Sequence, residues 1–166
     1  MLSNKQTLSI LQNVSKLKQV VEADLAPGAR AVVTDVIASL ESLLGGKPTR
    51  LTDHFTLEEF LASVTAVKHN LTLKPNGVVF ANLKNLCERV LEPARLELGQ
   101  PIYVSSGYRS DPLNRLVGGV PTSHHLTGRA ADVTTSFGKH DKLFEILSAL
   151  PHVELIDYKT FIHVAL

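Results

Sequence analysis

The sequence predicts an α+β fold with a small, mainly antiparallel sheet and flanking helices, preceded by an N-terminal helical hairpin. Three observations support this fold class. Apolar residues recur at helical spacing as far as residue 98, short apolar runs follow, and one more helical pattern lies between those runs. Helices that precede a group of short strands are typical of α+β domains.

Residues 1–47 have the pattern of two helices. Apolar residues recur every three or four positions over residues 3–24 and again over residues 32–44. Pro27-Gly28 interrupts the first pattern, and Gly45-Gly46 ends the second. We expect a helical hairpin that packs on the following domain or on a copy of itself. A role in binding a partner, the cell wall or a membrane surface stays open.

Two further helices are expected before residue 100. Thr56 with the acidic pair Glu58-Glu59 is the signal of a helix N-terminus, so a short helix should begin there. Apolar residues then recur at helical spacing over residues 77–98, which predicts a long core helix that ends at Gly99. Pro93 should bend this helix, because proline cannot complete the helical hydrogen-bond pattern.

The last third of the chain contains four short runs of strand character. A helix is expected between the second and third of these runs, over residues 142–150. The predicted strands cover residues 102–104, 130–133, 153–156 and 161–164.

The bulk composition indicates a globular protein. The chain has 166 residues, which suits one ordinary domain and a small appendage, and its hydrophobic fraction of 44% predicts a real core. Seventeen basic residues balance sixteen acidic ones, so no net field attracts nucleic acid, and we expect no nucleic-acid partner. The single Cys87 rules out an intrachain disulfide framework and is expected to be a buried small hydrophobic residue.

The N-terminus does not have the pattern of a signal peptide, because polar residues interrupt the first 20 residues. No apolar run approaches the roughly 20 residues that a transmembrane helix needs. We therefore expect synthesis in the cytoplasm without a signal peptide or a transmembrane segment.

The residues most suggestive of chemistry lie between 123 and 132. His125 and Asp132 are seven positions apart, and Asp132 begins or lies within a predicted strand that can hold its carboxylate. Gly128 permits close backbone approach, and Ala130 leaves space beside a metal ion. A histidine and an aspartate at this spacing also occur in ordinary loops and helix caps, so a third ligand is needed.

His163 is the candidate for that third ligand. It lies in the predicted strand 161–164, where alternation puts it on the same face as Phe161 and Ala165. A hydrogen-bonded core histidine is the alternative interpretation. Two imidazoles and one carboxylate leave the fourth position of a zinc ion to water, which is the arrangement of a catalytic zinc site rather than a structural one.

At these positions the chain resembles a known family of zinc peptidases. The family comprises D-alanyl-D-alanine carboxypeptidases, VanX- and VanY-like dipeptidases and phage L-alanyl-D-glutamate endolysins, and its fold is shared with the Hedgehog signalling domain. The likeness covers residues 53–166, which would form the zinc peptidase catalytic domain. It rests on the pattern S-x-H-x-x-G-x-A-x-D and on a terminal W/F-V/I-H-V segment, met by Ser123, His125, Gly128, Ala130, Asp132 and Phe161–Val164.

The resemblance implies one zinc ion per chain and a carboxylate that acts as general base on the zinc-bound water. In the most similar subgroup this carboxylate matches Asp157, whereas the more familiar spacing falls on Thr160, which cannot serve. Glu154 is the second candidate, because a tight hairpin through Tyr158 and Lys159 would bring it opposite His163. A solvated charge at a strand end is the alternative interpretation of either acid.

Other site residues are also implied by the resemblance. The guanidinium of Arg109 would hold the substrate carbonyl or carboxylate near zinc and stabilise the developing oxyanion. Tyr108 and Arg109 belong to the similar S-G-Y-R segment at residues 106–109. Tyr108 would contact substrate, and Ser123 would hydrogen-bond substrate or a ligand. His124 would line the pocket or face solvent.

These features predict a peptidase that hydrolyses a bond in the stem peptide of bacterial peptidoglycan. L-Ala-D-Glu endopeptidase and D-Ala-D-Ala carboxypeptidase activity are both open, because the residues that distinguish them lie in variable loops. The missing signal peptide suits a phage or prophage lysin that reaches the wall after release, or a virion enzyme. An inactive, zinc-stabilised cell-wall-binding or structural module of a phage or prophage assembly is the alternative function.

Overall fold

A computed structural model of the protein describes residues 49–166, together with positions 10, 13, 14, 17, 33, 36 and 37. The chain divides into two units, residues 1–47 and residues 48–166. The described positions of the first unit have helical backbone. The expected hairpin otherwise lies outside the described residues and stays a prediction.

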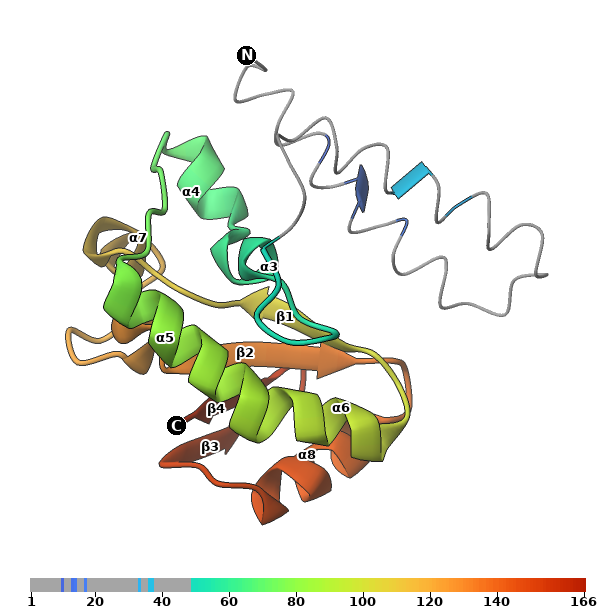
Figure 1. Ribbon diagram of the computed structural model, residues 1–166. Helices are drawn as coiled ribbons and strands as arrows, with labels where there is room; N and C mark the ends of the chain where they lie inside the picture. The colour runs from blue at the N-terminus through green and yellow to red at the C-terminus, as the bar shows by residue number, and fades with distance from the viewer. Residues whose placement is uncertain (1–9, 11–12, 15–16, 18–32, 34–35, 38–48) are drawn as a thin grey trace. The chain divides into compact units, whose positions relative to one another are not determined.

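The second unit is built on a four-stranded antiparallel sheet (Figure 1). Its order is β1-β2-β4-β3, so β2 and β4 are the central strands. The strands are β1 (Ile102–Ser106), β2 (Ala130–Thr135), β3 (Glu154–Asp157) and β4 (Ile162–Ala165). All four were expected within two residues of these bounds, and the predicted α+β class with a mainly antiparallel sheet is confirmed.

The predicted capped helix begins where the sequence indicates. It is α3 (Leu57–Leu61), and Thr56 and Glu59 form a reciprocal capping box at its start. The helix predicted over residues 142–150 is α8 (His140–Ala149). Three short helical elements were not anticipated, because one turn or two is too short to show a periodicity: α4 (Val64–Lys68), α7 (Asp111–Leu116) and the 3₁₀ turn η2 (His124–Thr127).

The long core helix consists of three consecutive segments. It runs through α5 (Gly77–Leu86), a π-helical turn η1 (Cys87–Leu91) and α6 (Glu92–Leu98), and ends at Gly99 in the left-handed conformation. Pro93 was expected to bend this helix, and the structure has a π turn directly before it. In this turn the Glu92 amide donates to the Cys87 carbonyl. This wider turn ends just before Pro93 and makes room for its ring.

One face of the sheet carries the hydrophobic core. Helices α5 and α8 contribute buried leucines and an isoleucine to it, and α6 contributes Ala94. The sheet contributes the alternate residues Ala131, Val133, Ile162 and Val164. Because side chains alternate along a strand, Asp132 and His163 point to the opposite face. The two are direct cross-strand partners, which places the polar site on the face away from this core.

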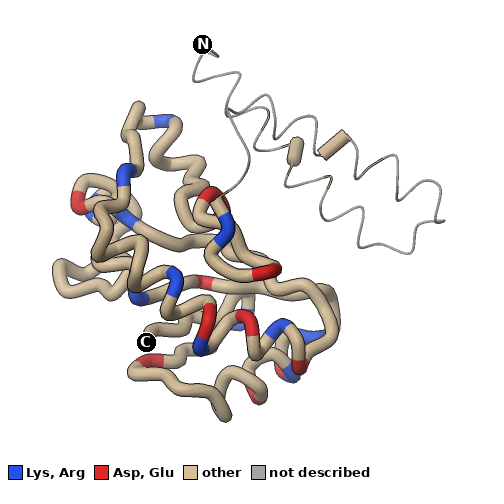
Figure 2. The backbone as a smooth tube through the Cα atoms, viewed as in Figure 1, with Lys and Arg blue, Asp and Glu red and all other residues tan. Residues whose placement is uncertain are grey.

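The surface of the second unit carries mixed charge. Acidic and basic residues are interspersed along residues 49–166 (Figure 2), as the near-neutral net charge suggests. Among the described residues, no helix has the length and apolarity that a bilayer span requires.

Replacing Gly128 with alanine is expected to destabilise the domain by about 2–5 kcal/mol. Gly128 has a φ of 71°, and an added Cβ would lie 2.8 Å from the Val79 carbonyl oxygen of α5. Left-handed backbone costs an L-residue about 1–2 kcal/mol, and overpacking adds about 1–3 kcal/mol. Gly138 is the matched control, because its φ is 78° and nothing lies within 4 Å of an added Cβ. Urea unfolding of both variants measures the difference, and equal losses would show that the contact with α5 is unimportant.

Candidate metal centre

The three predicted metal ligands lie together on the open face of the sheet. Asp132 and His163 come from the central strands β2 and β4, and η2 brings in His125. Asp132 Oδ1 lies 2.8 Å from His163 Nδ1 and 3.2 Å from His125 Nε2, and these two nitrogens are 3.3 Å apart. All three residues are buried.

Hydrogen bonds on the outer side of each imidazole determine which nitrogen carries the proton. His125 Nδ1 donates to the Gly107 carbonyl at 2.7 Å, and His163 Nε2 donates to Glu154 Oε2 at 3.0 Å. In the neutral rings, His125 Nε2 and His163 Nδ1 then have lone pairs. Both lone pairs point at a carboxylate oxygen that also has only lone pairs, so a cation is needed between the three atoms.

The donor set fits a zinc ion. A tetrahedral zinc with ligand bonds near 2.1 Å separates its ligand atoms by roughly 3.4 Å. Two of the three spacings, 3.2 Å and 3.3 Å, are close to this value, and the third is 2.8 Å. Ligating histidines usually donate their other ring N–H to a carboxylate or a backbone carbonyl, as Glu154 and Gly107 accept here. Three protein ligands of this kind leave a position open to solvent or substrate.

The electrostatics of the cluster favour an ionised Asp132. Burial raises the pKa of this carboxyl, but the close contacts with the His125 and His163 rings and the nearby charge of Arg109 outweigh burial and hold the pKa well below its usual range. Burial lowers the pKa of His163, but Asp132 and Glu154 together shift it upward. The site therefore attracts positive charge to the centre of the cluster.

Arg109 lies beside the cluster rather than only facing solvent. Its Nη2 donates to Asp132 Oδ2 at 2.7 Å, and its Nε donates to Ser106 Oγ at 3.0 Å. Arg109 thus holds the carboxylate oxygen that does not face the two histidines. Neighbouring Tyr108 packs partly buried against the hydrophobic core, and its backbone amide donates to the Phe60 carbonyl.

The structure does not bring Asp157 into the cluster. Asp157 pairs with Ile162 across β3 and β4, so its side chain lies on the face opposite to His163. There it accepts hydrogen bonds from His140 Nε2 at 2.8 Å and Lys159 Nζ at 2.6 Å. Glu154, the second candidate, lies on the same face as His163 and bonds to its ring.

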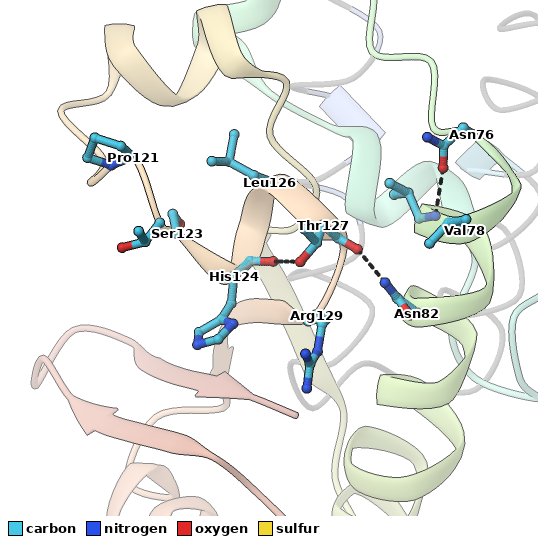
Figure 3. Close-up of a pocket in the computed structure, with 11 residues that line it drawn as sticks. Asn76, Val78, Asn82, Pro121, Ser123, His124, Leu126, Thr127 and Arg129 are labelled. Carbon is cyan, nitrogen blue, oxygen red and sulfur yellow. Dashed lines mark hydrogen bonds between the residues drawn. The ribbon is translucent and has the colours of Figure 1, made fainter.

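A pocket of about 550 Å³ is lined in part by η2 and does not include the three ligands of the cluster. It lies between the start of α5 and residues 121–129 (Figure 3). Ser123 and His124 line it, whereas the next residue, His125, is buried. The chemical groups for a reaction lie in the cluster and not in this pocket.

Sequence reasoning missed two supporting groups. The Gly107 carbonyl, which orients His125, is a backbone atom and has no residue signature. However, an added Cβ at Gly107 would lie 2.5 Å from the Phe60 Cα, which explains the glycine. Ser106 orients Arg109 and belongs to the S-G-Y-R motif. Its position three residues before Arg109 in this motif was the signal that could have identified it.

Replacing Asp157 with asparagine is expected to lower stability at neutral pH but not in acid. Hydrogen bonds from Lys159 and His140 hold the pKa of Asp157 well below its usual range. A depressed pKa in the folded state stabilises the fold above the unfolded pKa of roughly 3.9, and this stabilisation is lost as the pH falls through the folded value. Urea unfolding between pH 7 and pH 2 should show the difference between the two proteins shrinking on acidification. A constant difference would contradict the ion pairing, and Lys159→Gln should weaken the pH dependence.

The fold and the site together define a class of protein. Two histidines and an aspartate, oriented by outer hydrogen bonds and open on one side, are typical of metal-dependent hydrolases. A sequence model of the peptidase M15 family matches residues 53–165. The chain belongs to this peptidase M15 family, whose members are zinc-dependent peptidases. Among curated proteins, none matches the chain.

Proposed function

We propose that the protein is a zinc metallopeptidase that hydrolyses a peptide bond in the stem peptide of bacterial peptidoglycan. The observation that carries this proposal is the convergence of His125 Nε2, His163 Nδ1 and Asp132 Oδ1, whose lone pairs need a cation. Membership of the peptidase M15 family supports the peptide substrate. The ligand set has no cysteine and leaves one position open, which supports catalysis over a structural role.

One zinc ion held by these side chains would supply an acidified water nucleophile and polarise the scissile carbonyl. Arg109 uses Nε and Nη2 for Ser106 and Asp132, and its remaining N–H groups are available to a substrate oxygen. They would stabilise the negative charge that develops on that oxygen.

We assign the general base to Glu154 rather than Asp157. Glu154 is on the same face as His163, and its side chain is 45% exposed, so it can reach a water molecule above the cluster. In the resting arrangement it holds Nε2 of His163, and rotation of its exposed carboxylate would let it accept the proton of the attacking water.

Two peptidase activities are candidates, and they differ in the bond that is cleaved. Endolysin-like L-Ala-D-Glu endopeptidase action would release whole peptides from the wall, whereas D-Ala-D-Ala carboxypeptidase action would release single D-alanine residues. Mass spectrometry of purified peptidoglycan after digestion by the zinc-loaded protein distinguishes them. Free D-alanine as the sole product excludes the endopeptidase, and an undigested wall would contradict both activities.

A second candidate function is a zinc-stabilised wall-binding or structural module without turnover. The position of Asp157 favours it, because the carboxylate that matches the family pattern lies on the opposite face and Glu154 is engaged with His163. Such a module would bind zinc and sediment with purified walls. Neither the wild type nor Glu154→Gln would digest these walls.

We further propose that the protein acts on the wall after release during phage or prophage lysis, or within a virion. Residues 1–47 would then serve self-association or partner binding, as their two helical patterns suggest. Light scattering of the full chain tests self-association, and a mass equal to one chain would contradict it.

A further inference from the structure

The face of the sheet that holds Asp132 and His163 extends beyond the metal centre. On this face Ser106 is the cross-strand partner of Asp132, and Ile156 is the partner of His163. Because alternate residues of a strand share a face, the next row on the same face lies two residues further along each strand. This second row consists of Tyr103, Thr134, Phe161 and Tyr158.

Two aromatic rings of the second row are stacked on each other. The ring centroids of Tyr158 and Phe161 are 4.7 Å apart, and the ring planes differ by 22°. The Tyr158 amide donates to the Phe161 carbonyl at 3.0 Å, which holds the two residues opposite each other where β3 and β4 meet. Neither ring belongs to the hydrophobic core or packs against it, and Tyr158 is 52% exposed. The pair therefore forms an aromatic surface that a ligand can reach.

The chemistry of the second row suits a sugar ring. Its four side chains offer rings and hydroxyl groups and carry no charge. Lys159, the charged residue that follows Tyr158, is paired with Asp157 at 2.6 Å. A pyranose has apolar C–H faces and a rim of hydroxyl groups, so it matches an exposed ring with a polar edge. The charged glutamate and diamino acid of a stem peptide would find no partner in this row.

The second row is within reach of a substrate held at the metal centre. Phe161 and His163 lie two residues apart on one face of the sheet, which corresponds to about 7 Å along the strand. In peptidoglycan a short lactyl group joins the first alanine of the stem peptide to the sugar, so the L-Ala-D-Glu bond lies at a similar distance from the sugar ring. The D-Ala-D-Ala bond is three residues further along the peptide, roughly 10 Å more.

We propose that Tyr158 and Phe161 bind a pyranose ring of the glycan while the adjoining stem peptide lies at the metal centre. The inference rests on the proposed peptidase function and, of its two candidate bonds, favours L-Ala-D-Glu. The exposed part of the Tyr158 ring covers the apolar face of the sugar. A stem peptide that is still attached to its sugar should therefore be the preferred substrate.

The test compares two ligands that carry the same stem peptide, one attached to the disaccharide of the wall and one with an acetylated N-terminus. In both, the L-Ala-D-Glu bond is reduced and cannot be cleaved, so calorimetric titration of the full-length, zinc-loaded protein measures binding alone. We expect the wild type to bind the glycosylated ligand about tenfold more tightly, because burial of roughly 55 Å² of apolar surface contributes about this factor. Tyr158→Ala should lose this factor for the glycosylated ligand and keep its affinity for the acetylated one.

Two variants control for the loss of an exposed apolar side chain. Tyr158→Phe retains the ring and should retain the preference for the glycosylated ligand. Leu96→Ala removes a side chain that is 65% exposed on α6, a helix on the core face of the sheet, and should bind both ligands as the wild type does.

Equal affinity of the wild type for both ligands would overturn the inference. Equal losses for both ligands in Tyr158→Ala would also overturn it, because the rings would then contact the peptide. Hydrolysis of the same two ligands with an ordinary amide bond is measured separately. If they are cleaved without a preference for the sugar, the inference fails and the peptidase proposal stands. If neither is cleaved but the glycosylated ligand binds more tightly through Tyr158, the peptidase proposal fails and the glycan-binding surface stands.

Discussion

Replacing His125 with alanine is expected to abolish both metal binding and hydrolysis. The substitution removes one of three converging ligand atoms and leaves Asp132 and His163 as a two-ligand site. Loss of a residue that merely supports a ligand typically costs 10–100-fold in metal affinity, so the loss of a ligand itself should cost more than about 100-fold. Metal analysis after purification without chelator should find one zinc ion per wild-type chain and none in the variant.

His124→Ala is the matched control for this experiment. His124 is the neighbouring residue on the same 3₁₀ turn, but it lines the pocket and is not one of the three residues of the cluster. This variant should retain its zinc ion. Because His125 is 2% exposed, urea unfolding should accompany both measurements. A folded His125→Ala protein with a full zinc content would contradict the proposed ligand set.

The metal cluster could be predicted because each ligand has a local signal. His125 lies three residues before Gly128, where close backbone approach was expected, and Gly128 has a φ of 71° and no room for a Cβ beside α5. Asp132 and His163 each interrupt an apolar strand, where a polar side chain needs a partner. Strand alternation then puts both on one face, and the observed register pairs them directly.

The sequence named both candidate carboxylates, Asp157 and Glu154, but could not decide between them. The register of β3 against β4 decides which β3 side chains lie on the face of His163. In the structure, Ile156 pairs with His163. A shift of one position would exchange the faces of Glu154 and Asp157. The register depends on the loop between the two strands, in which the Tyr158 amide donates to the Phe161 carbonyl. Spacing along the chain alone does not contain this information.

The π turn before Pro93 was unpredictable for a related reason. Proline in a helical pattern indicates a local disturbance, but a kink, a break or a widened turn would each relieve its clash with the preceding carbonyl. Val90 and Leu91 within the turn are fully buried. Packing against the sheet therefore favours the outcome that keeps these side chains in the core.

Glu154→Gln and Asp157→Asn should separate the two carboxylates by their effects on catalysis. We expect Glu154→Gln to lower kcat by about 100-fold, the usual contribution of a general base. Its zinc affinity should also fall by about 10–100-fold, because the variant loses the ionised partner of His163 Nε2. Asp157→Asn should leave kcat within about threefold, since ordinary surface substitutions rarely disturb a distant site.

The reason for this contrast is the face that each side chain occupies. Glu154 contacts a metal ligand, whereas Asp157 contacts His140 at the start of α8 on the far side of the sheet. Steady-state kinetics on purified wall fragments, with zinc content measured for each variant, give both quantities. A larger loss from Asp157→Asn would mean that the working enzyme pairs β3 and β4 in a different register, because only a shift of one residue brings Asp157 to the face of His163.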